Sequence, residues 1–192
     1  LLIGYALCQR YFPPIVAALL IPIIIAILIR GAFQESPPII LLIALLYLSL
    51  PIMPSLNFFA GYPLRLLVSK ASALLLQING LQVFSDGTTL IWQQQAYAVD
   101  APCSGLKMLW VGFALSAIIA IWQKSNVKTS IMLFSGSLVI LISCNVMRTT
   151  SLFYNDFFLK KAFSHDSIGL VLFCLACVSI LAWNEVLRRK IC

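Results

Sequence analysis

Long uncharged runs of apolar residues, separated by short polar stretches, recur along the chain. The first run lies between Arg10 and Arg30 and comprises the 19 residues 11–29. A bilayer core is crossed by about 20 apolar residues in an α-helix. A second run extends from residue 39 to about residue 56, after a Pro-Pro turn signal, and two prolines interrupt its far end. We predict a membrane-spanning helix from each run.

Three more apolar runs follow in the C-terminal half, over about residues 104–122, 131–147 and 167–183. Charged residues separate the runs, so three helices that cross the membrane in alternating directions are predicted. It follows that the residue before the first span, the residue after the second and those before the third share one side of the membrane. These residues are Cys103, Arg148 and His165.

The stretch from residue 61 to 79 is ambiguous, because Arg65 and Lys70 interrupt its apolar sequence. Only 15 uncharged residues separate Lys70 from Asp86. We favour an amphipathic helix that lies at the membrane interface. A short tilted span is the alternative, and the number of spans before residue 61 depends on this choice.

Residues 81–99 have a different pattern. Two β-prone runs, residues 81–85 and 88–92, flank the turn pair Asp86-Gly87, and residues 93–99 alternate imperfectly. The hydrocarbon core tolerates no open strand edge, so this segment is expected outside it. The predicted fold is an all-α, polytopic transmembrane helical bundle with a small β-like extramembrane segment near 81–99.

Composition agrees with this fold. Hydrophobic residues make up 61% of the chain and charged residues 10%, and the mean hydropathy is +1.01, whereas soluble domains are about 45–50% apolar. The net charge of +7 is scattered singly between apolar runs, as membrane anchors are, and this argues against a nucleic-acid partner. We expect a single transmembrane domain over residues 1–192. The chain begins in an apolar run without methionine, so we expect its N-terminus to be truncated.

One polar stretch, residues 100–107, carries the candidate chemistry. Pro102 disfavours helix before it and an uncharged apolar run follows, so a helix is expected to begin here with Cys103 at its N-terminus. A helix N-terminus favours thiolate over thiol. We therefore expect this end, Arg148 and a protonated His165 to hold the pKa of the Cys103 thiol below its ordinary value. The alternative is that Cys103 is a small buried hydrophobic residue.

Arg148 and His165 would supply the other groups that a thiol nucleophile needs. His165 is the single histidine of the chain, and histidine serves as general base and acid near neutral pH. A guanidinium stabilises the oxyanion of acyl transfer. Each residue alone has a plainer explanation, as a snorkelling anchor or a surface histidine, but their shared membrane level favours catalysis. One histidine without clustered carboxylates predicts no metal site and no cofactor.

The sequence also resembles a family. Residues 103–106 (Cys-Ser-Gly-Leu) before one span, residues 145–148 (Asn-Val-Met-Arg) at the end of the next, and His165 ahead of a third resemble the exosortase/archaeosortase family of integral membrane transpeptidases. The resemblance covers a catalytic region of about residues 61–183, including residues 63–65 (Pro-Leu-Arg). It implies a nucleophile, a transition-state stabiliser and a general acid/base, which are respectively Cys103, Arg148 and His165.

The resemblance also implies the substrates. They are secreted proteins with a C-terminal sorting signal, which consists of a PEP-CTERM-like motif, a hydrophobic span and a basic tail. Cleavage at the motif is followed by transfer of the new C-terminus to a lipid-linked or glycan acceptor. The enzyme would lie in the cell membrane, among its lipids, with the active site on the outer side; the basic residues divide too evenly to orient the chain. Supporting or substrate-binding candidates are Ser104, Gly105, Lys107, Asn145 and Arg65.

Other thiols and functions remain as alternatives. Cys174 and Cys177 fall in the middle of a span and are interpreted as packing residues, whereas Cys144 lies one turn before Arg148 and is the second candidate nucleophile. A membrane thiol oxidoreductase would need a cysteine partner close to Cys103. A non-enzymatic assembly or transport protein would place polar residues near the middle of the bilayer.

Overall fold

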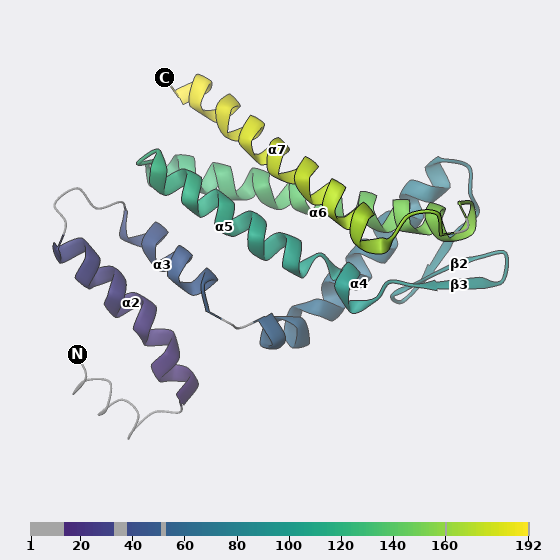
Figure 1. The fold of residues 1–192 in the computed structure, drawn as a ribbon, viewed down its shortest axis with the longest axis horizontal. Coiled ribbons are helices and arrows are strands. Elements are labelled where there is room, and N and C mark those ends of the chain that lie inside the picture. Colours follow the sequence, from purple (N-terminus) through teal and green to yellow (C-terminus); the bar gives the residue numbers. More distant parts are fainter. Residues whose placement is uncertain (1–13, 33–37, 51–52, 160, 192) are drawn as a thin grey trace. The chain divides into compact units, whose positions relative to one another are not determined.

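The computed structural model describes residues 14–32, 38–50, 53–159 and 161–191. These residues form α-helices, one 3-10 helix and three short strands (Figure 1). The helices are α2 (Pro14–Ala32), α3 (Ile39–Leu48), α4 (Met53–Ile78), η1 (Ala101–Ser104), α5 (Leu106–Trp122), α6 (Val127–Phe157) and α7 (His165–Ile191). The strands are β1 (Phe84–Asp86), β2 (Thr89–Trp92) and β3 (Gln95–Ala98). The predicted fold class, a helical membrane bundle with a small sheet, is confirmed.

The chain divides into two compact units. The first comprises Leu1–Leu50 with Ala117–Ser130, and within it α2 packs against α3. The second comprises Pro51–Ser116 with Ile131–Cys192. All of the candidate site residues belong to the second unit.

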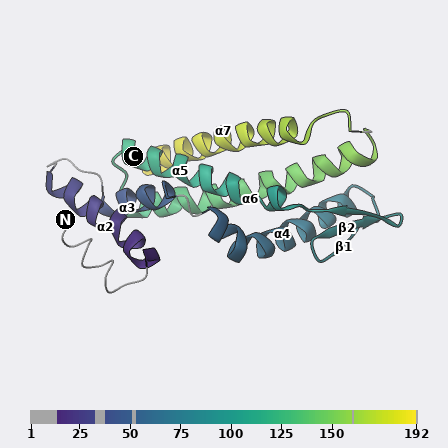
Figure 2. The same cartoon turned by 60° about the horizontal axis from the view of Figure 1, so that its bottom comes forward.

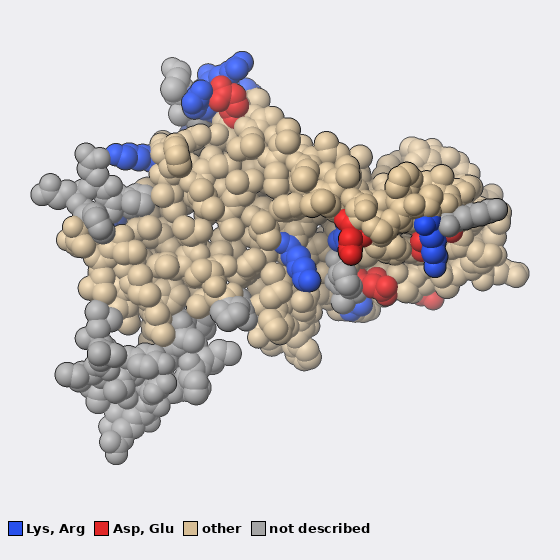
Figure 3. Space-filling model, in the orientation of Figure 1, with Lys and Arg blue, Asp and Glu red and all other residues tan. Residues whose placement is uncertain are grey.

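Three described helices, α4, α6 and α7, are long and apolar enough to cross a membrane. Their exposed side chains include many large apolar ones, such as Val139, Leu170 and Val178, as expected for surfaces that face lipid. Helix α5 has 17 residues, at the lower end of the spanning range of about 17–25. Figure 3 shows an extensive uncharged surface on which charged residues occur in small groups.

The structure corrects the predicted spans before residue 80. Helix α3 ends at Leu48, so the predicted span over 39–56 is wrong, and a separate helix, α4, takes over from Met53. The structure favours a span, not an interfacial helix, for residues 61–79, because α4 continues through Pro63 for 26 residues. Arg65 lies within it and donates a hydrogen bond from Nε to the Gly61 carbonyl at 3.4 Å. In the first predicted span, residues 11–13 lie outside the described residues, as do residues 35–37 of the predicted turn.

The extramembrane segment near 81–99 is a three-stranded antiparallel sheet in the order β1-β2-β3. Asp86 pairs with Thr89, so the first turn consists of Gly87 and Thr88, one residue later than predicted. The second turn consists of Gln93 and Gln94, with φ angles of 48° and 65°. Two consecutive positive φ angles are typical of a type I′ turn, which matches the twist of a tight hairpin.

A hydrophobic core joins the sheet to the helices. The sheet lies against α4 (Figure 2), and residues of α6 complete the cluster. Its buried members are Val68, Ala73, Leu76, Val83, Leu90, Tyr97, Val99, Cys103, Leu152 and Phe153. The thiol of Cys103 is therefore part of the core that fixes the sheet to α4 and α6.

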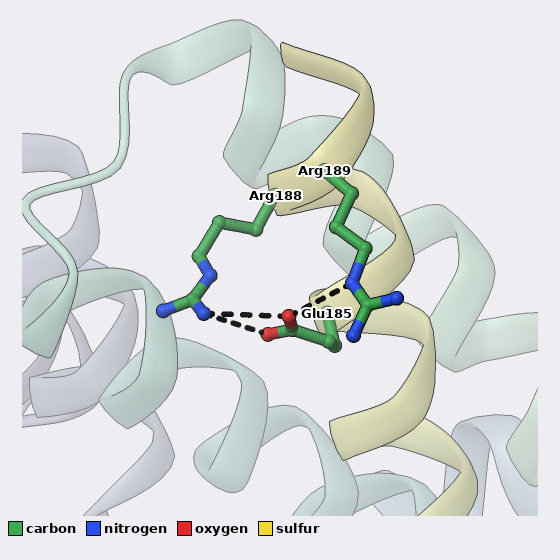
Figure 4. Close-up of polar contacts among 3 residues, drawn as sticks. All are labelled: Glu185, Arg188 and Arg189. Atoms are coloured by element: carbon green, nitrogen blue, oxygen red, sulfur yellow. Dashed lines mark hydrogen bonds and ion pairs between the residues drawn. The ribbon is translucent and has the colours of Figure 1, made fainter. Parts of the chain in front are cut away.

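Helix α7 ends in a small charged cluster (Figure 4). Glu185 forms ion pairs with Arg188 at 3.2 Å and with Arg189 at 3.1 Å. Such exposed pairs contribute little to stability. Basic residues at a helix C-terminus do complement its dipole, and here they end the apolar stretch of α7.

Candidate active site

Cys103 lies in η1, just before α5. Its backbone N–H donates a hydrogen bond to the Asp100 carbonyl at 2.9 Å. Gly105 then takes a left-handed φ of 79°, and α5 begins at Leu106, whose N–H donates to Ser104 Oγ at 3.3 Å. The helix start predicted at this point is confirmed. The Cys103 side chain is 6% exposed.

Asn145 of α6 holds this segment in place. Its Nδ2 donates a hydrogen bond to the Cys103 carbonyl at 3.0 Å. A Cβ at Gly105 would lie 2.5 Å from the same nitrogen, so a side chain there would displace Asn145. Position 105 therefore requires glycine for two reasons, its positive φ and the close approach of Asn145.

Arg148 lies one turn after Asn145 on α6 and is partly buried. Its guanidinium lies against Gly169 of α7, where a Cβ would be 3.0 Å from Nε. Helix α6 continues to Phe157, ten residues beyond the predicted end of the span at Met147, so Arg148 is held within a helix. A side chain fixed by a helix on one side and a glycine on the other is well ordered for directed hydrogen bonding.

The pKa of the Cys103 thiol is raised, chiefly because burial disfavours the charged thiolate. The Arg148 guanidinium opposes this and lowers the pKa, and the Asp100 carboxylate adds to the increase. The expectation that helix end, arginine and histidine together lower the pKa is thus wrong for the protein at rest.

His165 is the first residue of α7, as the predicted third span requires. Its side chain is 51% exposed, and Nε2 lies 3.5 Å from Oδ1 of Asp156, which is 18% exposed. Within the described part of the chain, no hydrogen bond joins His165 to Cys103. The sequence analysis did not identify Asp156. Its spacing of eight residues from Arg148 could have indicated it, because residues at this spacing share a helix face. That argument requires α6 to continue past residue 147.

Tyr97 of β3 lies among the same groups. It is 8% exposed, and its ring packs against Phe153 with the centroids 6.1 Å apart. Burial raises the pKa of its hydroxyl, and the nearby Cys103, Asp156 and Asp100 raise it further while Arg148 lowers it. The structure thus places Tyr97 in the same core cluster as the Cys103 thiol.

These groups gather beside the C-terminal part of α6. The family model described as transmembrane exosortase matches residues 1–182. The chain belongs to the transmembrane exosortase family. It is accordingly an integral membrane protein. Neither the curated proteins nor the solved structures give a match to this exosortase.

A cavity of about 320 Å³ opens beside Arg148 of the exosortase. Its lining residues come from the start of α5, from α6 and from the start of α7, and are Lys107, Met108, Val111, Arg148, Asp166, Gly169, Leu170 and Phe173. Lys107, a predicted supporting residue, thus lines the same cavity as Arg148. Arg65 is not among the lining residues and contacts Gly61 on its own helix.

The other described cysteines lie on spanning helices. Cys144 is on α6, and Cys174 and Cys177 are on α7, and all three are free thiols. Cys103 differs from them in two ways. It precedes its helix, and the charge of Arg148 lowers the pKa of its thiol.

Proposed function

We propose that this exosortase is a cysteine transpeptidase that cleaves the C-terminal sorting signal of secreted proteins. The signal consists of a PEP-CTERM-like motif, a hydrophobic span and a basic tail. The observation that carries the proposal is the convergence on Cys103. Asn145 donates a hydrogen bond to the Cys103 carbonyl. The charge of Arg148, one turn later on the same helix, lowers the pKa of the Cys103 thiol.

In the first half-reaction the Cys103 thiol gives its proton to His165, and the sulfur attacks the carbonyl carbon of the scissile peptide bond. The Arg148 guanidinium stabilises the negative charge that develops on the carbonyl oxygen. The C–N bond then breaks, and His165 returns its proton to the leaving amine. The products are a thioester on Cys103 and the released signal fragment.

In the second half-reaction an acceptor amine attacks the thioester carbon. The amine is carried by a lipid or a glycan at the cell surface, and its proton passes to His165. The C–S bond breaks, the thiolate takes a proton, and the cleaved protein is left attached to the acceptor. If water attacks instead, the same steps yield a free carboxylate.

The raised pKa of Cys103 fits this sequence of steps. A thiol that stays protonated at rest needs a base at the moment of attack, and His165 is the available one. Catalytic hydrogen bonds are often longer before substrate binds. His165, which is half-exposed and paired with Asp156, would turn to the thiol when the substrate arrives. The active site would face the outer side of the cell membrane, where translocated substrates arrive.

The proposal is tested by trapping the thioester. The purified protein is incubated with a sorting-signal peptide, quenched in acid and examined by intact-mass spectrometry. A mass increase on Cys103 equal to the N-terminal peptide fragment is expected. The Cys103→Ser variant should lose the adduct and all processing, since a hydroxyl is a far weaker nucleophile at neutral pH. The matched variant Cys144→Ser should keep both; adducts that disappear with Cys144 would reassign the nucleophile.

A further inference from the structure

Strand β3 presents part of its backbone away from the sheet. The Val99 N–H donates to the Thr88 carbonyl at 2.9 Å. Hydrogen-bonded and non-hydrogen-bonded pairs alternate along an antiparallel ladder. The bond marks Val99 and Thr88 as a pair of the hydrogen-bonded kind, so the register of β2 and β3 puts Ala96 and Ala98 in the non-hydrogen-bonded pairs. In such pairs the backbone N–H and C=O groups point outward from the edge of the strand.

That edge is open among the described residues. The strand order leaves β3 with β2 on one side, and no described residue makes a backbone hydrogen bond with Ala96 or Ala98. Both alanines are exposed. The opposite edge strand, β1, contacts α4. An open edge with unpaired N–H and C=O groups is a ready template for another extended chain.

The edge also leads directly to the nucleophile. β3 ends at Ala98, Val99 is buried, and Asp100 accepts the backbone hydrogen bond of Cys103. Tyr97, between the two alanines, is anchored in the core against Phe153. The outward groups are therefore held on a rigid strand that is continuous with the segment carrying the thiol.

We infer that the substrate residues next to the scissile bond bind as an added strand on the edge of β3. This inference rests on the proposed function and deepens it. Its occupant is an extended peptide, held through its main chain by Ala96 and Ala98. The small alanine side chains leave room for the side chains of the peptide. The backbone pairing would fix the register of the peptide, and its side chains would determine which motif is accepted.

The test measures binding, so that it does not depend on cleavage. A fluorescent sorting-signal peptide is titrated onto the Cys103→Ser protein in detergent micelles, and its anisotropy is recorded. Ala96→Pro removes an outward N–H without breaking the ladder to β2, because proline is tolerated at such edge positions. The matched variant Ala96→Val keeps the N–H and suits a strand. We expect peptide affinity to be about 5- to 10-fold lower in Ala96→Pro than in Ala96→Val, as for a lost hydrogen bond.

A second series changes the peptide. N-methylation of single amides should weaken binding at every second residue, because alternate amides of an added strand face the edge. Equal affinity of Ala96→Pro and Ala96→Val, or N-methylation effects without a two-residue period, would overturn the inference. A change in oligomeric state in Ala96→Pro with unchanged peptide affinity would also overturn it and would assign the edge to a second copy of the chain. Loss of the Cys103 thioester in the trapping experiment, with edge-dependent binding retained, would instead refute only the proposed chemistry.

Discussion

Two stretches of helix α6 both pack side chains against glycines of neighbouring segments, but the side chains differ in kind. Near its middle, Leu141 lies against Gly112 of α5, where a Cβ would be 2.5 Å from Leu141 Cδ1. Nearer its C-terminus, Asn145 and Arg148 lie against Gly105 and Gly169. In both stretches a glycine lets a neighbouring side chain approach the backbone closely. In the middle stretch the close approach packs apolar groups, and in the other it positions polar ones.

The two stretches differ in how their polar groups are satisfied. In the middle, Ser116 Oγ of α5 lies 2.9 Å from the Gly112 carbonyl and 2.8 Å from Ser137 Oγ of α6, so its hydroxyl can donate to the carbonyl and accept from Ser137. At the other end, Asn145 Oδ1 is buried without a hydrogen-bond partner among the described residues. Buried polar atoms are normally satisfied, and an exception calls for an explanation. Unused hydrogen-bonding capacity, rather than polarity itself, therefore distinguishes the Asn145 stretch of α6 from its middle.

The largest effect should come from Arg148→Lys. Lysine keeps the charge but lacks the planar fork that directs two hydrogen bonds, so the acylation rate of Cys103 should fall by about 100-fold or more, as when other oxyanion donors are removed. The matched change in the middle stretch is Ser137→Ala. It should cost about 0.6 kcal/mol of stability, a typical value for a hydrogen bond between membrane helices, and should leave acylation within a few-fold. Single-turnover kinetics measure the acylation rate, and thermal unfolding measures the stability. If Arg148→Lys and the unaltered protein acylate at equal rates, Arg148 is a membrane anchor only.

A smaller effect is expected from the two glycines. Gly105→Ala places a Cβ on a residue with φ of 79° and against Asn145, so both stability and the rate of acylation per folded molecule should fall. Gly112→Ala meets Leu141 instead and should lower stability by about 1–3 kcal/mol, as overpacking does, with acylation per folded molecule retained. Denaturation curves and active-site titration separate the two. A Gly112→Ala protein that is folded but inactive would contradict the division of α6 into two stretches.

The smallest effect concerns the pH dependence of alkylation at Cys103. Because the pKa of the thiol is raised, less thiolate exists at neutral pH, so reaction with iodoacetamide should be slower than for a free thiol and should rise at higher pH. Arg148→Ala removes the lowering influence and should move the curve to still higher pH. His165→Ala should leave it in place, since the groups that shift this pKa are Arg148 and Asp100. A protein with Cys103 as its sole cysteine is the reporter, and a curve below the ordinary thiol range would contradict the effect of burial.

Much of this arrangement follows from the sequence. Pro102 followed by an uncharged run was sufficient to predict the helix start beside Cys103. The alternation of apolar runs predicted a helix that begins close to His165, and α7 does begin there. The catalytic roles of Cys103, Arg148 and His165 stay predictions, because roles depend on contacts with a substrate.

Other features had no local signal. Arg65 and Lys70 made the apolar sequence of α4 look interrupted, yet the helix continues through both, and the arginine donates a hydrogen bond to the Gly61 carbonyl of its own helix. The second hairpin turn uses two glutamines at positive φ, where glycine or asparagine is the usual signal.

The length of α6 before Arg148 has a consequence for the substrates. Nineteen uncharged residues, 129–147, precede this arginine, and at a rise of about 1.5 Å per residue they extend about 28 Å, close to the thickness of the hydrocarbon core of about 30 Å. Under the proposed function, Arg148 would thus lie where the hydrocarbon core ends. A substrate held by its own membrane span would then need its cleavage site close to the end of that span, because each added residue of extended chain moves the bond by about 3.3 Å.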